Sequence, residues 1–388
     1  MNKYPQAKIW HVGGEDVRMR IPLLKALKIR GFSVGAIGTE DAKIFEENDI
    51  PYKKYSLYRW VGPFSDFQSY RQLRSIFSEL RPDIVHGFDT KPAILTPIAG
   101  NKLEGLQSLR TVTGMGYVFS SNSISAKIIK PFYRFFQKIA SQRASKTIFQ
   151  NPDDKKYFED TALIAKNKSL MVRGSGIDIS EFLNKQVSED EIADLKATLC
   201  IENKLVVIMV ARLVKDKGVL EFLEASRIVK SQQNNVEFLL VGPITGEGTE
   251  AIGLNTINKY MNTVNYLGKR TDIAALLHIS DVFVLPSYYR EGLPRVLLEA
   301  GVANLPLITT DMPGCKEVVI PDWNGWLVKP RSISDLAEKI NQAVTIDENE
   351  RELMGKRSSQ LVQTEFNLDK VADEYAAIYK SILGQNYE

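Results

Sequence analysis

The sequence has few of the residues from which covalent or metal-centred scaffolds are built. Of its 388 residues, two are cysteine and three are histidine. Cys200 and Cys315 form no motif with each other or with a histidine. Neither a disulfide framework nor a structural zinc site is therefore expected.

A long apolar run is missing as well. No stretch approaches the roughly 20 consecutive apolar residues that span a bilayer. The first residues, MNKYPQAKIWHVGG, lack the apolar centre of a signal peptide. We therefore expect a cytoplasmic protein without a transmembrane helix.

The composition is that of a globular protein, with 44% hydrophobic and 25% charged residues. The net charge of +3 is unevenly distributed. Residues 1–180 contain 28 Lys and Arg against 17 Asp and Glu, whereas the remaining residues contain 22 against 30. A basic half beside an acidic half indicates that one half meets an anionic surface.

Short apolar stretches alternate with amphipathic ones along the chain. This alternation predicts an α/β protein with parallel sheets covered by helices on both faces. The length predicts two or three domains. Thr147–Gln150 is expected to be the last strand of the first half, and the polar stretch before Leu205 is expected to be a connector.

One strand–loop–helix–strand unit, residues 281–310, carries the clearest chemistry. An apolar strand, Val282–Leu285, leads into a polar loop, and Pro294 suits the first position of the following helix. The N–H groups of Gly292 and Leu293 would lie at the mouth of this helix, where an anion such as phosphate is stabilised. Two carboxylates flank them, Glu291 and Glu299.

These residues fit a nucleotide that is linked to a sugar. Glu299 could accept hydrogen bonds from two ribose hydroxyls, and Glu291 could bind a sugar hydroxyl beyond the phosphates. From pattern alone, an ordinary βα unit with acidic residues near a positive helix end explains the sequence equally well.

The run EGLPRVLLEA, residues 291–300, resembles the E-x7-E signature of the family 4 glycosyltransferases. The resemblance covers nearly the whole chain. It implies a GT-B fold, in which two Rossmann-like domains face each other across a cleft and a last helix returns to the first domain. The domain bounds expected on this basis are 1–176, a linker at 177–203, 204–366, and a final helix at 367–388.

The resemblance also implies the reaction, a hexosyl transfer from a nucleotide-diphosphate sugar to a hydroxyl with retention of anomeric configuration. We expect a UDP-sugar as donor and a polyprenyl-diphosphate-linked saccharide as acceptor, in bacterial O-antigen or capsule synthesis. The chain contains no Asp-x-Asp, the usual metal–diphosphate motif, so we expect neither a metal nor a cofactor. A UDP-sugar 2-epimerase and a non-catalytic sugar-nucleotide-binding scaffold are the alternatives.

Two cations follow the first strand of the second half. Arg212 and Lys217 leave the carboxyl end of Leu205–Val210, where they could hold the charge of a departing diphosphate. Loop cations often only face water, but the resemblance matches this pair to the family's phosphate-binding Arg and Lys. It also implies that Gly242, Arg270, Leu293 and Pro294 contact the donor.

Loops after three strands of the first half supply further candidates. Gly14, in a glycine pair after the first strand, is expected from the resemblance to face the donor phosphates. His86 and Asp89 lie at the end of another strand, where α/β sheets bind ligands. Thr113 and Gly114 begin a Thr-Gly-Met-Gly loop at which many family members carry a histidine that this chain lacks.

Residues 124–146 form a basic amphipathic stretch with six cations and no acid. Such a helix fits an anionic membrane, here the cytoplasmic face of an inner membrane. An ordinary domain helix and a nucleic-acid contact are alternatives, but no nucleic-acid motif accompanies the charge. The residues expected to meet the membrane are Lys127, Lys130, Phe132, Arg134, Phe135 and Lys138.

Overall fold

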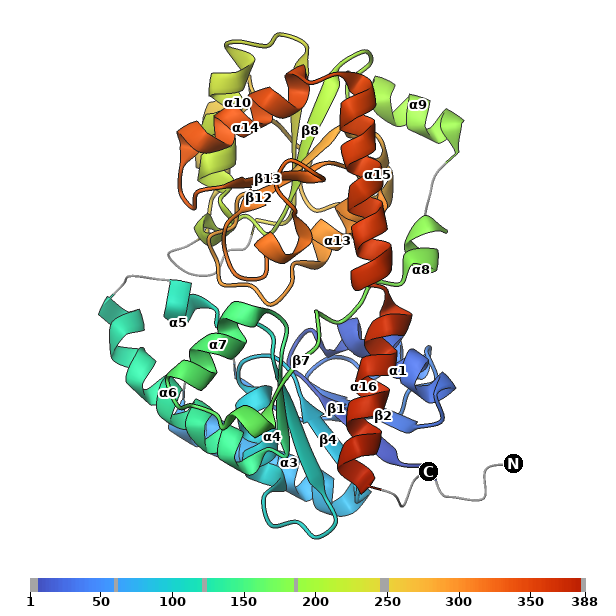
Figure 1. Ribbon diagram of the computed structural model, residues 1–388, viewed down its shortest axis with the longest axis vertical. Helices are drawn as coiled ribbons and strands as arrows, with labels where there is room; N and C mark the ends of the chain where they lie inside the picture. The colour runs from blue at the N-terminus through green and yellow to red at the C-terminus, as the bar shows by residue number, and fades with distance from the viewer. Residues whose placement is uncertain (1–5, 59–61, 121–123, 185–187, 245–250, 385–388) are drawn as a thin grey trace. The chain divides into compact units, whose positions relative to one another are not determined.

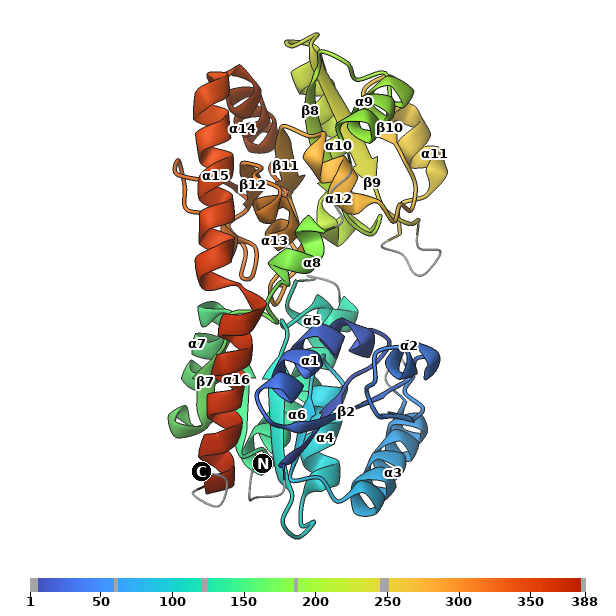
Figure 2. The same ribbon diagram turned by 90° about the vertical axis from the view of Figure 1, so that its right-hand side faces the viewer.

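The computed structural model describes residues 6–58, 62–120, 124–184, 188–244 and 251–384. It divides into two compact units, residues 1–176 with 368–388 and residues 177–367. Each unit is built on one parallel sheet, as Figures 1 and 2 show. The stretch 177–203 clusters with the second unit and contains α8 (Ile179–Leu183) and α9 (Glu189–Thr198).

The sheet of the first unit has seven strands in the order β3-β2-β1-β4-β5-β6-β7. Its first two strands are parallel neighbours in the sheet, and a helix connects them along the chain. This arrangement is the one expected from alternating strands and helices. The strands are β1 (Lys8–Val12), β2 (Ser33–Gly38), β3 (Tyr52–Lys54), β4 (Ile84–Gly87), β5 (Gln107–Val112), β6 (Lys146–Phe149) and β7 (Ser169–Met171).

Helices cover both faces of this sheet. On one face α1 packs against α16, and on the other α3, α4 and α6 pack in a row (Figures 1 and 2). The helices of the first unit are α1 (Ile21–Ile29), α2 (Lys43–Glu46), α3 (Pro63–Leu80), α4 (Pro92–Gly100), α5 (Tyr117–Ser120), α6 (Ile124–Arg143), α7 (Pro152–Asp160) and α16 (Leu368–Leu383).

The prediction that Thr147–Gln150 is the last strand of the first half is wrong. β6 is followed by α7 and then by β7, which pairs in parallel with β6. β7 has three residues, Ser169–Met171, and is too short to show the apolar run by which a buried strand is predicted.

The C-terminal helix α16 completes the core of the first unit. Leu368, Val371, Ala372, Tyr375 and Tyr379 are buried in the same apolar cluster as residues of β1 and α1. Their spacing of three and four residues places them on one side of the helix. Residues far apart in the sequence therefore form one hydrophobic core.

The second unit has a sheet of six strands in the order β10-β9-β8-β11-β12-β13. β8 lies between β9, which follows it in the chain, and β11, so the strand order reverses beside β8. The strands are β8 (Leu205–Val210), β9 (Val236–Val241), β10 (Asn265–Tyr266), β11 (Val282–Leu285), β12 (Leu307–Thr310) and β13 (Gly325–Val328). The further helices are α10 (Val219–Lys230), α11 (Leu254–Ile257), α12 (Ile273–His278), α13 (Arg295–Val302), α14 (Ile333–Thr345) and α15 (Glu348–Glu365).

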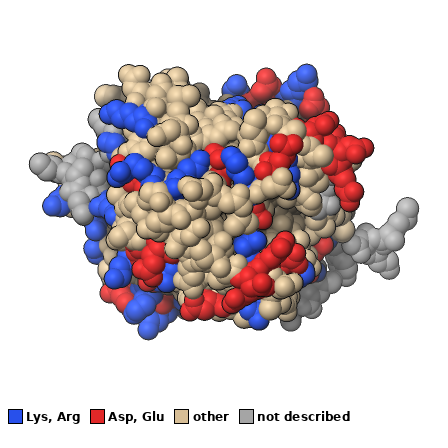
Figure 3. Space-filling view, turned by 90° about the horizontal axis from the view of Figure 1, so that it is seen from above, with Lys and Arg blue, Asp and Glu red and all other residues tan. Residues whose placement is uncertain are grey.

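Charge is unevenly distributed over one face of the molecule. On the face drawn in Figure 3, Asp and Glu gather along one side, whereas Lys and Arg lie mainly toward the other. Within the described ranges, no helix combines the length and the apolar character that crossing a membrane requires.

Candidate functional site

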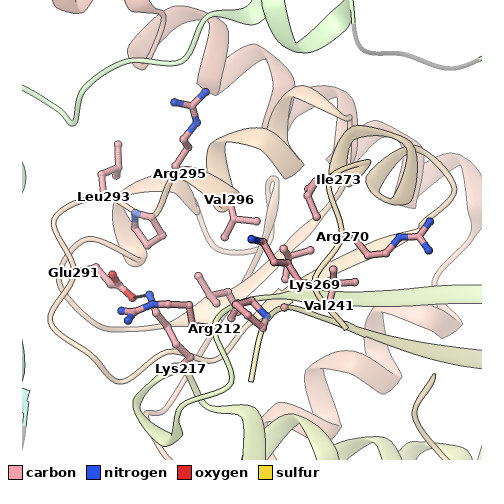
Figure 4. Close-up of a pocket in the computed structure, with 16 residues that line it drawn as sticks. Arg212, Lys217, Val241, Lys269, Arg270, Ile273, Glu291, Leu293, Arg295 and Val296 are labelled. Carbon is pink, nitrogen blue, oxygen red and sulfur yellow. Dashed lines mark hydrogen bonds and ion pairs between the residues drawn. The ribbon is translucent and has the colours of Figure 1, made fainter. Parts of the chain in front are cut away.

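A pocket of about 490 Å³ lies at the carboxyl ends of β8, β9 and β11 in the second unit (Figure 4). The strand order reverses here, and open α/β sheets bind ligands at such a switch point. Five cations and one carboxylate are among its lining residues, so the pocket favours an anion. These charged residues are Arg212, Lys217, Lys269, Arg270, Arg295 and Glu291.

The turn after β8 carries Arg212 and Lys217. It ends at Gly218, whose φ of +76° suits glycine and which begins α10. A Cβ atom on Gly218 would lie 2.2 Å from the carbonyl oxygen of Pro286, so only glycine lets this turn approach the loop after β11 so closely. The close approach brings Lys217 to Glu291.

Lys217 and Glu291 form an ion pair at the pocket wall (Figure 4). The two side chains are 17% and 12% exposed, respectively, so water screens their charges only partly. Both groups also line the pocket. A bound anion could therefore take Lys217 from Glu291 and leave the carboxylate to bind another polar group.

The loop from Glu291 to α13 differs by one residue from the prediction. Pro294 is the N-cap of α13 and not its first helical residue, because its ψ of 114° is extended. Leu293 and Pro294 line the pocket, whereas Gly292 is buried and is not among the lining residues. A Cβ atom on Gly314 would lie 2.6 Å from the carbonyl oxygens of Glu291 and Gly292, so the next loop packs directly on this one.

Glu299 does not line the pocket in this structure. Its carboxylate accepts a hydrogen bond of 3.0 Å from Nε of Arg295, four residues earlier on α13. Arg295 itself lines the pocket, and the sequence interpretation missed it. The i, i+4 spacing of Arg295 and Glu299 was the signal that could have predicted this pair.

Gly242 and Arg270 lie at the other end of the pocket, beyond β9 and β10. A Cβ atom on Gly242 would lie 1.8 Å from the carbonyl oxygen of Ala211, which restricts the position to glycine. Nε of Arg270 donates to Asp272 over 2.8 Å, and this hydrogen bond raises the pKa of Arg270. The neighbouring Lys269 also lines the pocket and was missed.

Cys315 is fully buried, close enough to Lys217 and Glu291 to feel their charges. Burial raises the pKa of its thiol to about 12, and the negative charge of Glu291 contributes. The thiol is therefore neutral at ordinary pH and acts as a small packing group.

The candidates of the first unit follow β1, β4 and β5, at the carboxyl edge of their sheet. The backbone N–H of Gly14 donates to Asp89 over 3.4 Å. Asp89 also lies 3.8 Å from the guanidinium of Arg20, a buried cation that the sequence interpretation missed. Thr113 and Gly114 are partly exposed beyond the end of β5, so both can reach solvent.

His86 is not available to a ligand, so its assignment as a candidate is withdrawn. Its side chain is fully buried. Nδ1 lies 2.7 Å from the hydroxyl of Tyr379 on α16, and Nε2 lies 2.8 Å from that of Thr111. His86 is therefore part of the polar core that attaches α16 to the first unit.

The basic helix α6 turns aromatic side chains outward. Phe132 and Phe135 are 65% and 59% exposed, respectively, and Lys127 and Lys138 are exposed beside them. The side that faces the sheet includes buried Gln137, whose side chain binds Arg110 of β5. The helix thus exposes aromatic rings beside its lysines, while its buried side holds the polar Gln137 together with Tyr133 and Ala140.

Two of its cations contact the unit itself. Nζ of Lys130 lies 4.6 Å from the ring centre of Phe119, and Arg134 donates to the hydroxyl of Tyr157 over 3.2 Å. Lys127 and Lys138 are therefore the cations of the expected set that face solvent most fully.

Comparison with known proteins defines the class to which this fold and pocket belong. The family model "Glycosyl transferase 4-like" matches residues 10–151, and "Glycosyl transferases group 1" matches residues 191–360. The crystal structure of a glycosyltransferase from Rickettsia africae has a TM-score of 0.81 at 22% identity and covers 98% of this chain and 100% of its own. HepE of Anabaena in complex with UDP has a TM-score of 0.77 at 19% identity. The match covers 96% of this chain and 100% of HepE.

The architecture is thus that of a GT-B glycosyltransferase, which confirms the predicted fold. The chain belongs to the group 1, or family 4, glycosyltransferases. It is 28% identical to the N,N'-diacetylbacillosaminyl-diphospho-undecaprenol alpha-1,3-N-acetylgalactosaminyltransferase of Campylobacter jejuni, over 96% of this chain and 97% of that protein. It is 27% identical to the UDP-Gal:alpha-D-GlcNAc-diphosphoundecaprenol alpha-1,3-galactosyltransferase of Escherichia coli, over 93% of this chain and 92% of that protein.

Proposed function

We propose that this glycosyltransferase moves a hexosyl group from a UDP-sugar to a hydroxyl of a polyprenyl-diphosphate-linked saccharide, with retention of anomeric configuration. The reaction would belong to bacterial surface polysaccharide synthesis, such as that of O-antigen or capsule. The observation that carries the proposal is the cationic pocket with Glu291 at its wall. Relatives named for undecaprenyl-diphosphate acceptors, one of which also names UDP-Gal, support these substrates.

In this proposal Arg212 and Lys217 hold the diphosphate of the donor. The bond between the anomeric carbon and the phosphate oxygen breaks, and negative charge grows on the departing UDP. Two cations placed at that oxygen stabilise the growing charge more in the transition state than in the bound donor. Gly292 and Leu293 lie just before the N-cap of α13, and the positive end of this helix adds a partial positive charge.

The acceptor oxygen forms the new bond to the anomeric carbon on the face from which UDP leaves. Its proton passes to the departing phosphate oxygen, so no side chain is needed as a base. Glu291 binds a hydroxyl of the transferred sugar. The first-unit residues Gly14, Asp89, Thr113 and Gly114 are proposed to contact the substrates, and this assignment rests on their place at the carboxyl edge of the sheet.

The ribose and base would occupy the far end of the pocket. Glu299 is proposed to bind the ribose hydroxyls once Arg295 has turned toward the donor phosphates. Gly242 and Arg270 are proposed to lie beside the base, and Lys269 joins them on the same wall.

We further propose that α6 docks the first unit on an anionic membrane, where a polyprenyl-linked acceptor resides. The supporting observation is that Phe132 and Phe135 are exposed on this helix beside the exposed Lys127 and Lys138. Exposed aromatic rings enter the interface of a bilayer, and flanking lysines meet anionic head groups. The enzyme would then act at the cytoplasmic face of the inner membrane.

A product assay tests the reaction. The full-length protein is incubated with a panel of UDP-sugars and a short polyprenyl-diphosphate-linked saccharide, and the products are analysed by mass spectrometry and NMR. We expect UDP release that requires the acceptor, together with a new α-linkage from an α-linked donor. An epimerised UDP-sugar formed without acceptor, or UDP binding with no turnover of any donor, would contradict the proposal.

A further inference from the structure

We propose that Ser287 is a positioning residue that orients Glu291 for sugar transfer. This inference rests on the proposed function, because it assigns to Ser287 a role that acts through Glu291. Ser287 follows β11 and is fully buried. Its Oγ lies 3.0 Å from Oε1 of Glu291, the same oxygen that pairs with Lys217.

The hydroxyl of Ser287 also reaches the turn that carries Lys217. Oγ lies 3.2 Å from the carbonyl oxygen of Asp216, the residue immediately before Lys217. One side chain therefore touches both the carboxylate and the turn that bears its cationic partner. A shift of either segment would change the position of this hydroxyl relative to the other.

Backbone contacts hold the two segments in this arrangement. The carbonyl oxygen of Asp216 accepts hydrogen bonds from the N–H groups of Tyr288 and Tyr289, over 2.9 and 3.1 Å. Thr310 of β12 donates its hydroxyl hydrogen to the carbonyl oxygen of Ser287. Ser287 is thus fixed by its neighbours, and its hydroxyl can act as a rigid reference point for Glu291.

The role of this reference point changes when a donor binds. In the structure, Oε1 of Glu291 has both Lys217 and Ser287 as partners. A diphosphate that attracts Lys217 removes the first partner and leaves the hydroxyl of Ser287 in place. The serine then limits rotation of the carboxylate while it binds the sugar, and this alignment is worth most in the transition state.

A double-mutant cycle on the full-length enzyme tests the inference. Ser287→Ala is expected to lower kcat about tenfold while the Kd for UDP changes by less than about twofold, because the hydroxyl does not line the pocket. In a Glu291→Gln background, Ser287→Ala is expected to cause little further loss, because both changes remove the same alignment. Ser287→Cys, which keeps a weak donor of similar size, is expected to give an intermediate kcat.

Ser226→Ala is the matched control. Ser226 is also a fully buried serine of the second unit, but its hydroxyl binds Leu223 and Thr263 away from the pocket. This variant is expected to keep the kcat of the wild type.

Three results overturn the inference: a wild-type kcat for Ser287→Ala, losses that multiply in the double variant, or a kcat for Ser287→Cys as low as that of Ser287→Ala. Failure of the proposed function looks different. The wild type itself would then turn over no UDP-sugar with the acceptor present, or would epimerise a UDP-sugar without it.

Discussion

Lys217 and Glu291 are 74 residues apart in the sequence and form one ion pair in the folded second unit. In the proposed reaction each side chain has a separate task, since Lys217 binds the leaving diphosphate and Glu291 binds the sugar. Both side chains are partly buried, where charges interact more strongly than in water. Removal of either group should therefore affect the reaction more than it affects the fold.

The first prediction concerns this pair. Glu291→Gln and Lys217→Ala are each expected to lower kcat by at least about tenfold, or about 1.4 kcal/mol of barrier. Steady-state kinetics of UDP release, with an acceptor present, measure the effect. Lys215→Ala, a change in the same turn at a residue outside the pocket lining, is the control and should stay near the wild-type rate. Rates near wild type in both site variants would contradict the assignment.

At this scale the sequence predicted the motif residues better than their partners. Arg212, Lys217 and Glu291 were chosen from motif and spacing, and all three line one pocket. Ser287 was missed because its role depends on contacts made by the folded loops, whereas Arg295 was missed although its i, i+4 spacing from Glu299 is visible in the sequence. His86 was chosen for its place at a strand end, but burial and two hydrogen-bond partners remove it from solvent.

Among the elements, the turn before α10 is the one on which the pocket depends most closely. Gly218 has a φ of +76°, and a Cβ atom at this position would lie 2.2 Å from the carbonyl oxygen of Pro286. The turn can bring Lys217 to the pocket only because this residue has no side chain.

The second prediction follows from this turn. Gly218→Ala is expected to lower the free energy of unfolding by about 1–3 kcal/mol, because alanine is strained in this conformation and the turn must move away from Pro286. Urea unfolding of the full chain measures the change. Gly253→Ala is the control, since a Cβ at Gly253 meets no atom within 4 Å. Equal stability of both variants with the wild type would show that the turn tolerates a Cβ.

The helix α6 carries both aromatic rings and lysines on its exposed side. The third prediction is that Phe132→Ser and Phe135→Ser, combined with Lys127→Glu and Lys138→Glu, weaken binding to vesicles of phosphatidylglycerol and phosphatidylethanolamine at least about tenfold. Each lysine near an anionic surface contributes about 1 kcal/mol, so two charge reversals alone account for this loss. Co-sedimentation measures it.

The control for this experiment changes two other exposed lysines of the first unit. Lys54→Glu and Lys102→Glu alter the net charge by the same amount but lie outside α6. They should leave vesicle binding nearly unchanged. Equal binding by the α6 variant and the wild type would rule out α6 as the docking helix.

Element types were predictable where the apolar pattern was long, and less so where it was short. The basic stretch 124–146 became the helix α6, Ile124–Arg143. β7, with three residues, was not predicted, and Pro294 was placed one residue too far into α13. β7 is defined by its pairing with β6, and the start of α13 is defined by the geometry of the loop before it. Neither can be read from composition.

On the scale of the whole molecule, α16 joins the last residues of the chain to the first unit through buried histidines. The hydroxyl of Tyr379 lies 3.0 Å from Nε2 of His11 and 2.7 Å from Nδ1 of His86. Burial, together with the charge of Arg20, lowers the pKa of His11 to about 3. Burial likewise lowers the pKa of His86, to which nearby His11 and Arg20 contribute.

The fourth prediction is a loss of stability in acid. Both histidines stay neutral in the folded protein but bind protons when unfolded, with an ordinary pKa of about 6.5. Their stabilising effect is therefore present above about pH 6.5 and is lost as the pH falls toward the lowered folded pKa, by up to about 1.4 kcal/mol per histidine per pH unit.

Urea unfolding between pH 7.5 and 5 measures this dependence. His11→Gln should lower the number of protons taken up on unfolding by about one, and so reduce the slope of the unfolding free energy against pH. His278→Gln is the control, since His278, the third histidine, is exposed. The same pH dependence in His11→Gln and the wild type would contradict the prediction.

The central claim is that the cationic pocket of the second unit binds the nucleoside diphosphate of the donor. The most direct measurement is the thermal shift caused by UDP, GDP, ADP and dTDP, with EDTA or with magnesium, for the wild type and for Arg212→Ala combined with Lys217→Ala. A ligand at about 100 times its Kd stabilises the folded state by about 2.7 kcal/mol. We expect UDP with EDTA to raise the Tm of the wild type and to have little effect on the double variant. No shift with any nucleotide, or an equal shift in both proteins, would contradict the claim.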